Sequence, residues 1–402
     1  MSAAPVAALA IGQDSRAEAL VRNRVLLLLW LAALVAALVL AFVSVAPNRL
    51  TTGVGVPLRD LVSGRTGWLW LPAVLLLVAV FAPTSRWNHA GVAITASMLL
   101  AGLAWFAGRE AVVQSGLSSL ARVSVGGGFW ILMLLAWLAA ADALQRLGLA
   151  LAWRSVAHAA VWLPLLGLLL SGGLDGLSLL KEYDNRQNVF NAAGLRHLQI
   201  VAATLLPALL IGLPLGVAAA RTPAFARPLF GVLNIIQTVP SIALFALLIA
   251  PLAALAETLP GWGIQGIGLL PAVIALTLYA LLPIVHGTAS GLAQVPAAAV
   301  EAAVGMGMTR RQLFWRVELP LALPVLLSGL RVTTVQVIGL AVVAALIGAG
   351  GFGALVFQGL ASSALDLVLL GVLPVVALAV VADAVLALSA AAVEGPRDDR
   401  AA

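Results

Sequence analysis

The segment Glu301–Pro324, EAAVGMGMTRRQLFWRVELPLALP, has residue types that indicate a specific task. Helix-forming residues lead up to Gly305 and Gly307, and glycine commonly ends a helix. Thr309 stands three residues before Gln312, which is the spacing of a capping box and predicts a second helix start. Two short helices around a glycine turn carry no reacting group. The pattern therefore predicts a binding surface and not a catalytic site.

This surface would combine apolar and basic side chains. Leu313, Phe314 and Val317 form an apolar stripe, while Arg310 and Arg311 add positive charge. A helix that is too polar for lipid and lies between apolar segments suits docking on a partner. The alternative is an ordinary loop whose arginines bind lipid headgroups. The residues alone leave both interpretations open.

A second polar group interrupts an apolar stretch nearer the middle of the chain. Asn234, Gln237, Thr238 and Ser241 lie close together, with Pro240 beside them. Polar side chains at membrane depth tend to face the bundle interior or a water-filled path. We therefore take these five residues as a candidate translocation path or as a break in the helix. Hydrogen bonding between helices is the alternative.

The sequence offers little for bond-making chemistry. IGAGGFG, at Ile347–Gly353, lacks the Lys-Ser/Thr of a Walker loop, and we interpret it as a flexible connection between spans. The chain has no cysteine, and neither His158 nor His286 has a second histidine at ligand spacing. Metalloprotease and serine-hydrolase motifs are also missing. We expect no catalytic residue, no metal site and no ATP hydrolysis on this chain.

The composition indicates a membrane protein. Of its 402 residues, 62% are hydrophobic and 9% are charged, against about 25% charged in soluble domains, and the mean hydropathy is +1.10. The net charge of +6 is typical of arginines that flank membrane segments. Lipid leaves backbone groups without external partners, so apolar runs should be helices. We expect an all-α, polytopic protein with about ten spans, at Val25–Ala46, Trp68–Ala82, Ala90–Ala107, Gly126–Ala143, Val156–Leu170, Leu198–Ala220, Leu229–Leu255, Ile267–Val285, a long helix ending near Ile347, and Leu365–Leu388.

Arginine placement predicts the orientation. With both termini in the cytoplasm, every arginine in a predicted loop after residue 200 falls on the cytoplasmic side. The polar segment Ser171–Arg196 then separates an N-terminal block of about five helices, residues 1–190, from a C-terminal block, residues 191–402. Arg331 lies within a predicted helix, where we expect it to snorkel toward the cytoplasm, with an ion pair as the alternative.

The first segment described above resembles a motif of ABC importer permease subunits. Those proteins carry E-A-A, three residues, G, nine residues and I-x-L-P. This chain has Glu301-Ala302-Ala303, Gly307 and Val317-Glu318-Leu319-Pro320 at the same spacing, with Val replacing Ile. In the family this helix sits in a cleft of the cytoplasmic ATPase. The resemblance therefore implies a coupling loop near 296–318 with the ATPase-coupling residues Glu301, Ala302, Ala303, Gly305, Gly307, Arg310, Arg311, Leu319 and Pro320.

Other segments look like the osmoprotectant branch of that family, which transports glycine betaine, choline and carnitine. LNIIQTVPSIALFALL, LYALLPIVHGT and ALIGAGGFGALVFQGL carry this resemblance, which extends over about Leu198–Ala390. It implies a type I importer permease core in residues 191–402. Residues 1–190 resemble the additional membrane block of longer permeases in this branch, and their function stays open.

The resemblance also implies partners and a location. We expect a multi-pass subunit of the bacterial cytoplasmic membrane that binds no cofactor, while a separate cytoplasmic subunit holds ATP. The other expected partners are an extracytoplasmic solute-binding protein, a second copy or a related permease, and membrane lipid, but no nucleic acid. An importer for another solute, such as an amino acid, is the alternative. An ion-coupled carrier fits less well, because inverted repeats and mid-membrane charges do not stand out.

Overall fold

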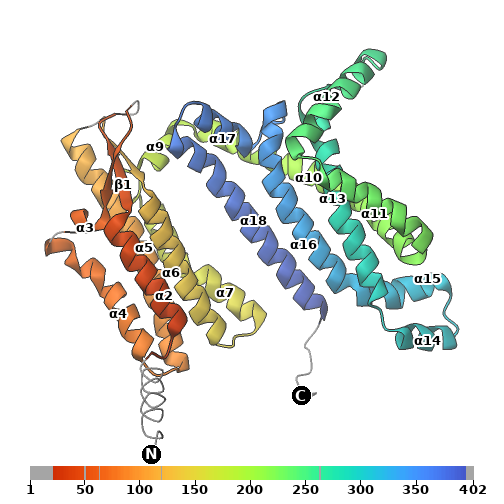
Figure 1. Cartoon of the computed structure of the whole chain (residues 1–402), viewed down its shortest axis with the longest axis horizontal. Helices are drawn as coiled ribbons and strands as arrows, with labels where there is room; N and C mark the ends of the chain where they lie inside the picture. The colour runs from red at the N-terminus through yellow and green to blue at the C-terminus, as the bar shows by residue number, and fades with distance from the viewer. Residues whose placement is uncertain (1–20, 49–50, 63, 119, 262–263, 395–402) are drawn as a thin grey trace, which may run out of the picture. The chain divides into compact units, whose positions relative to one another are not determined.

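The computed structural model describes residues 21–48, 51–62, 64–118, 120–261 and 264–394. The two termini, which we expect in the cytoplasm, lie outside these residues. The chain forms two compact units, Met1–Asp184 and Asn185–Ala402. Figure 1 shows that each unit is built mainly of long helices.

The N-terminal unit consists of helices and one small sheet. Its elements are α2 (Arg24–Val39), β1 (Ala41–Ala46), β2 (Val54–Pro57), α3 (Leu58–Leu61), a 3-10 helix (Gly64–Leu69), α4 (Trp70–Phe81), α5 (Arg86–Leu117), β3 (Arg122–Val125), α6 (Gly127–Arg146), α7 (Leu151–Val161), α8 (Leu163–Leu170) and α9 (Ser178–Asn185).

The sheet corrects the first predicted span. Strand β1 lies between β2 and β3 and is antiparallel to both. The predicted span Val25–Ala46 is therefore too long, since α2 ends at Val39 and the chain continues as β1. Phe42 on β1 is fully buried and packs against Phe106, with ring centroids 6.0 Å apart. The apolar composition of this segment is equally compatible with a helix and a strand. The pairing with β2 and β3 and the aromatic contact are what stabilise the strand.

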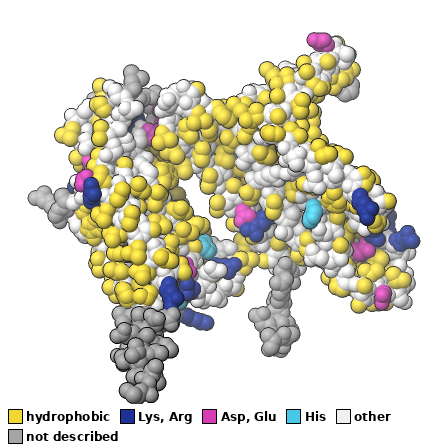
Figure 2. All heavy atoms as spheres, in the orientation of Figure 1, with side chains coloured by type: hydrophobic (Ala, Val, Ile, Leu, Met, Phe, Trp, Pro, Cys, Tyr) yellow, Lys and Arg dark blue, Asp and Glu magenta, His cyan; other side chains and the backbone are white. Residues whose placement is uncertain are grey.

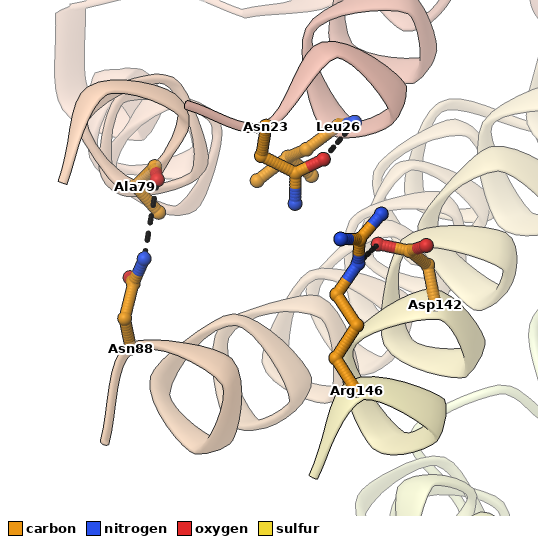
Figure 3. Close-up of polar contacts among 6 residues, drawn as sticks. All are labelled: Asn23, Leu26, Ala79, Asn88, Asp142 and Arg146. Carbon is orange, nitrogen blue, oxygen red and sulfur yellow. Dashed lines mark hydrogen bonds and ion pairs between the residues drawn. The ribbon is translucent and has the colours of Figure 1, made fainter. Parts of the chain in front are cut away.

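Polar contacts gather at the opposite end of α2 (Figure 3). Asn23 caps α2 by accepting from the Leu26 backbone N–H at 3.0 Å. Asn88, in the first turn of α5, donates to the backbone oxygen of Ala79 on α4 at 3.3 Å. Arg146 at the end of α6 pairs with Asp142, one turn earlier, at 2.8 Å. Helix ends from four segments therefore meet here.

The C-terminal unit contains helices only in its described residues. Its elements are α10 (Gln187–Arg221), α11 (Pro223–Thr238), α12 (Ser241–Thr258), α13 (Leu269–Ala293), α14 (Ala297–Gly305), α15 (Arg310–Leu313), a π-helical segment (Phe314–Glu318), α16 (Leu319–Val343), a 3-10 turn (Ala344–Ile347), α17 (Phe352–Ala361) and α18 (Leu365–Glu394).

Small residues let the central helices of this unit approach closely. Helix α13 packs against both α10 and α16, and α18 packs against α16 and α17. A Cβ at Gly287 on α13 would lie 3.1 Å from the Cα of Gly329 on α16. A Cβ at Gly216 on α10 would lie 2.4 Å from the Thr288 side chain. Such contacts are typical of helices that pack in a membrane, where lipid is as apolar as the side chains.

In the described residues of the N-terminal unit, fewer helices than the predicted five are long and apolar enough to count as candidate membrane spans. In the described part of the chain, eight helices are long and apolar enough to cross a membrane, and five of them belong to the C-terminal unit. Helix α2 has 16 residues, and the apolar helix Thr66–Phe81 is also short. Sixteen residues span about 24 Å, less than the roughly 30 Å of a hydrocarbon core. The predicted count of about ten is therefore not confirmed.

Candidate functional site

The first half of the predicted coupling loop is a helix that ends in a glycine turn. Helix α14 begins after Pro296 and closes in a Schellman motif. The Met308 N–H donates to the Ala303 oxygen at 3.1 Å, and the Gly307 N–H donates to the Val304 oxygen at 2.9 Å. Gly307 has φ of +77°, which a residue with a side chain adopts rarely. Gly305 is instead the last helical residue, so Gly307 alone makes the turn.

The predicted capping box is confirmed at the next helix start. The Thr309 hydroxyl accepts from the Gln312 backbone N–H at 3.3 Å, and the Gln312 side chain accepts from the Thr309 N–H at 2.9 Å. This helix is not a separate short element. Helix α15, the π-helical segment and α16 form one continuous helix, Arg310–Ile347.

The π-helical segment lies where this helix passes from the loop into the membrane span. The Leu319 N–H bonds to the Phe314 oxygen, five residues earlier, and Pro320 follows without an N–H of its own. Proline removes one helical hydrogen bond and its ring crowds the preceding turn, which is a physical reason for the wider turn here. Leu319 and Pro320 therefore sit at the joint between loop and span.

Figure 1 shows α14 and α15 at the end of the C-terminal unit where α13 ends and α16 begins. In Figure 2 basic and acidic side chains gather over this end. Of the predicted coupling residues, Ala303 is buried and Leu319 is half-buried. The others are exposed, namely Glu301, Ala302, Gly305, Gly307, Arg310, Arg311 and Pro320.

Three exposed apolar side chains on this surface were missed by sequence reasoning. Val304 is 57% exposed on α14, Met306 is 71% exposed in the turn, and Trp315 is 59% exposed in the π-helical segment. Leu313, which the sequence placed in the apolar stripe of this surface, is instead buried on the packed side of α15. A Met and a Trp beside arginines are residue types that are enriched at protein interfaces. The binding surface is thus apolar at its turn and basic around it.

An ion pair joins the joint region to a neighbouring span. Arg221, the last residue of α10, pairs with Glu318 at the end of the π-helical segment. The Glu318 side chain is only 11% exposed, whereas that of Arg221 is 51% exposed. Because one partner is mostly buried, breaking this ion pair should cost more stability than breaking a fully exposed pair. Sequence reasoning did not select Glu318, because it falls on the unspecified position of the I-x-L-P pattern.

The predicted path residues surround a real break between two helices. The predicted span Leu229–Leu255 is wrong as a single helix, since α11 ends at Thr238 and α12 starts at Ser241, with Pro240 in extended conformation between them. The missing N–H of proline and its effect on the preceding residue account for the break.

Helix α13 holds this break in place. Gln237 donates to the backbone oxygen of Tyr279 at 2.7 Å, and the Tyr279 hydroxyl donates to the oxygen of Val239. The Thr238 hydroxyl donates to the Ile235 oxygen within its own helix at 2.7 Å. Asn234 is exposed. The polar group is therefore partly structural, and Tyr279 is a partner that the sequence did not indicate.

The glycine-rich segment Ile347–Gly353 is a fixed turn. The Arg196 guanidinium on α10 donates to the Ala349 oxygen at 2.9 Å. A Cβ at Gly351, whose φ is +77°, would lie 3.2 Å from the ring nitrogen Nδ1 of His197. The interpretation as a flexible connection is therefore replaced by a turn packed on α10. Among the described residues, no group of three metal-ligating side chains occurs here or elsewhere.

Arg331 does not snorkel as predicted. It forms an ion pair with Asp383 on α18, and its Nη2 lies 2.6 Å from Oδ2 of that carboxylate. Asp383 falls near the end of the predicted span Leu365–Leu388, but α18 continues to Glu394, so Asp383 lies well inside the helix.

Two family models match this chain, one in each compact unit. Residues 22–180 match the family model for the N-terminal domain of ABC transporter permease YehY. Residues 212–395 match the model for the inner membrane component of binding-protein-dependent transport systems. The two matched ranges fall within the two compact units.

Two curated relatives each match 44% of this chain. The osmoprotectant import permease protein OsmW of Salmonella typhimurium is 43% identical over 178 residues, which is 44% of this chain and 79% of OsmW. The carnitine transport permease protein OpuCB of Listeria monocytogenes is 39% identical over 179 residues, which is 44% of this chain and 76% of that protein.

A solved structure of the MetNI methionine ABC transporter, in an inward-facing conformation, is similar with 24% identity and a TM-score of 0.45 over 51% of this chain and 96% of that chain. OsmW and OpuCB, each matched over more than two thirds of its own length, carry the family assignment. The chain therefore belongs to the osmoprotectant branch of ABC importer permeases, which are multi-pass subunits of the inner membrane.

Proposed function

We propose that the C-terminal unit forms the solute path and that the surface of α14, α15 and the π-helical segment docks on a separate cytoplasmic ATPase. The observation that carries this proposal is the construction of the loop. A left-handed glycine turn and a capping box fix the direction of α15, and α15 continues without interruption into a span. A displacement of the docked surface is therefore transmitted to α16 as a movement of one rigid helix.

The same construction assigns roles to the predicted residues. Glu301, Ala302, Arg310 and Arg311 would contact the ATPase, because they are exposed on this surface. Gly307 would set the turn, while Leu319 and Pro320 would form the joint with the span. The polar residues at the break between α11 and α12 would line the path. ATP would bind to the partner ATPase and not to this chain.

The substrate that we propose is a quaternary-amine osmoprotectant. The similarity to OsmW and OpuCB supports this class, since one is an osmoprotectant import permease and the other a carnitine transport permease. We propose an extracytoplasmic solute-binding protein as the component that selects the solute and a second permease, identical or related, as the other half of the path. Aromatic faces that hold the ammonium group would lie on the binding protein.

Uptake by the assembled transporter tests the substrate. Membrane vesicles that contain this chain, its ATPase and its binding protein should accumulate radiolabelled glycine betaine, choline or carnitine when supplied with ATP. An amino acid of similar size serves as the control solute. Accumulation of the amino acid alone would contradict the substrate class but leave the permease assignment intact.

The orientation that we propose places the loop, the two termini and the arginine-rich helix ends in the cytoplasm. The chain has no cysteine, so single cysteines report on one position each. Thr309→Cys should react with an impermeant thiol reagent only from the cytoplasmic side. Glu257→Cys, near the end of α12, should react only from outside; both residues are exposed. Labelling of Thr309→Cys in intact cells would contradict this orientation.

We propose a supporting role for the N-terminal unit, in assembly, stability or regulation. Its internal contacts support this division, since the Lys181 ammonium of α9 donates to the Ser115 hydroxyl of α5 at 3.0 Å within the same unit. Burial, and to a smaller extent nearby Arg122, lowers the pKa of Lys181. The unit carries neither the coupling motif nor the polar helix break.

A further inference from the structure

The ion pair between Arg331 and Asp383 lies deep in the C-terminal unit. The two side chains meet at two points, through Nε and Nη2 of the guanidinium and both carboxylate oxygens. At 1.5 Å per residue, Arg331 is about 18 Å along the helix axis from Leu319, where α16 starts. Asp383 is about 17 Å from Glu394, the last residue of α18. Both distances place the pair within the roughly 30 Å hydrocarbon thickness of a bilayer.

Both side chains are nevertheless accessible. The Arg331 side chain is 43% exposed and that of Asp383 is 38% exposed. Two of the three guanidinium nitrogens bond to the carboxylate, and Nη1 makes no hydrogen bond within the described part of the chain. Nη1 carries two N–H donors. Hydrocarbon offers these donors no acceptor, and an unsatisfied polar group there costs several kcal/mol. The exposed side of the pair therefore faces water or a surface with acceptors.

The helix face that carries Arg331 is polar over one further turn. Ser328 lies three residues before Arg331, on the same face of α16, and is exposed. Val381 on α18, two residues before Asp383, is 59% exposed on a different side of its helix. Ser328 therefore adds a polar exposed side chain beside Arg331, whereas Val380, three residues before Asp383 on the same face of α18, is apolar and 62% exposed. The polar side of the pair is thus the side that α16 contributes, and on this side we expect water.

We propose that the Arg331–Asp383 pair is a water-facing charged site in the wall of the cytoplasmic half of the solute path. The proposal rests on the permease role of this unit. A paired guanidinium and carboxylate expose a donor and an acceptor side by side, which matches a solute that carries a quaternary ammonium and a carboxylate. The pair has no net charge, so it can contact such a zwitterion without holding it too tightly for release.

Ser328→Cys tests this proposal without removing either charge. The assembled transporter is placed in inside-out vesicles and treated with a membrane-impermeant methanethiosulfonate that carries a quaternary ammonium group. Val381→Cys is the matched control, because it has a similar depth but another helix face. Thiols react as thiolates, which form in water, so we expect Ser328→Cys to react about tenfold faster or more. An importer moves solute from the lumen outward in this orientation, so modification of Ser328→Cys should also stop the ATP-dependent release of radiolabelled solute that was loaded with the binding protein into the same vesicles.

Three results would overturn the proposal. Ser328→Cys that is fully incorporated but unreactive would mean that lipid or protein covers this face. Equal rates at Ser328→Cys and Val381→Cys would remove the distinction between the two sides. Complete modification at Ser328→Cys with unchanged ATP-dependent release of solute would place the site outside the path. Failure of the permease role is distinguishable, because the unlabelled wild-type transporter would then release no solute with ATP, whereas the labelling rates do not depend on transport.

Discussion

Replacing Gly307 by valine should abolish solute-stimulated ATP hydrolysis and solute uptake together, while the protein still inserts and assembles. Gly307 has φ of +77°, and a Cβ at this position would meet no atom within 4 Å. The cost of a side chain is therefore conformational and not a clash with neighbouring residues. An L-residue in the left-handed region costs about 1–2 kcal/mol, which lowers the population of the observed turn roughly 5- to 30-fold.

The size of the effect should follow the backbone preference of the new residue. Asparagine tolerates the left-handed region best, alanine less well, and β-branched valine least. We therefore expect coupled transport to fall in the order Gly307→Asn, Gly307→Ala, Gly307→Val. Gly305→Ala is the matched control, because Gly305 is helical, its Cβ would also meet nothing within 4 Å, and alanine favours a helix by about 1 kcal/mol.

The assay compares solute-stimulated ATP hydrolysis with uptake in vesicles of the assembled transporter, at matched protein amounts. Gly307→Val should lose both activities, and Gly305→Ala should keep both. Wild-type rates for Gly307→Val would show that the direction of α15 is irrelevant to transport. Equal losses in Gly305→Ala and Gly307→Ala would show that the side-chain volume matters and the turn does not.

Three further predictions concern contacts around the same loop and the division of the chain. Glu301→Arg reverses the charge of an exposed residue of the docking surface, so it should weaken copurification of the ATPase, whereas normal copurification and uptake would contradict a contact there. Arg221→Glu places a like charge beside the mostly buried Glu318 carboxylate, which should lower the stability of the folded protein by about 1–3 kcal/mol and impair uptake. The double variant Arg221→Glu with Glu318→Arg restores opposite charges and should recover part of the loss. A chain that starts at residue 171 should still copurify with the ATPase, because the coupling loop belongs to the C-terminal unit, and a stably inserted chain that never copurifies would contradict this division.

Local signals could be predicted well from the sequence. The capping box depends only on Thr309 and on Gln312 three residues later, and the Schellman turn depends on Gly307 at the end of a helix-forming run. The five apolar helices of the C-terminal unit also follow from composition, because lipid restricts long apolar runs to helices. These features are set by neighbours in the chain and by the membrane.

Contacts between distant residues could not be predicted in the same way. The Arg221–Glu318 and Arg331–Asp383 pairs join residues that are 97 and 52 positions apart, and no periodic pattern encodes such pairing. Strand β1, which carries Phe42, is apolar enough to form a short helix instead, so its pairing with β2 and β3 decides its conformation.

Photo-crosslinking at Met306 tests the central claim most directly. Met306 is 71% exposed at the tip of the glycine turn, so a photoreactive residue placed there should disturb the fold little. In the assembled transporter we expect it to form a covalent adduct with the ATPase, whereas the same residue at the exposed position Glu257 should form none. An ATPase that copurifies fully but is never crosslinked from Met306 would contradict the proposal that this loop is the coupling surface.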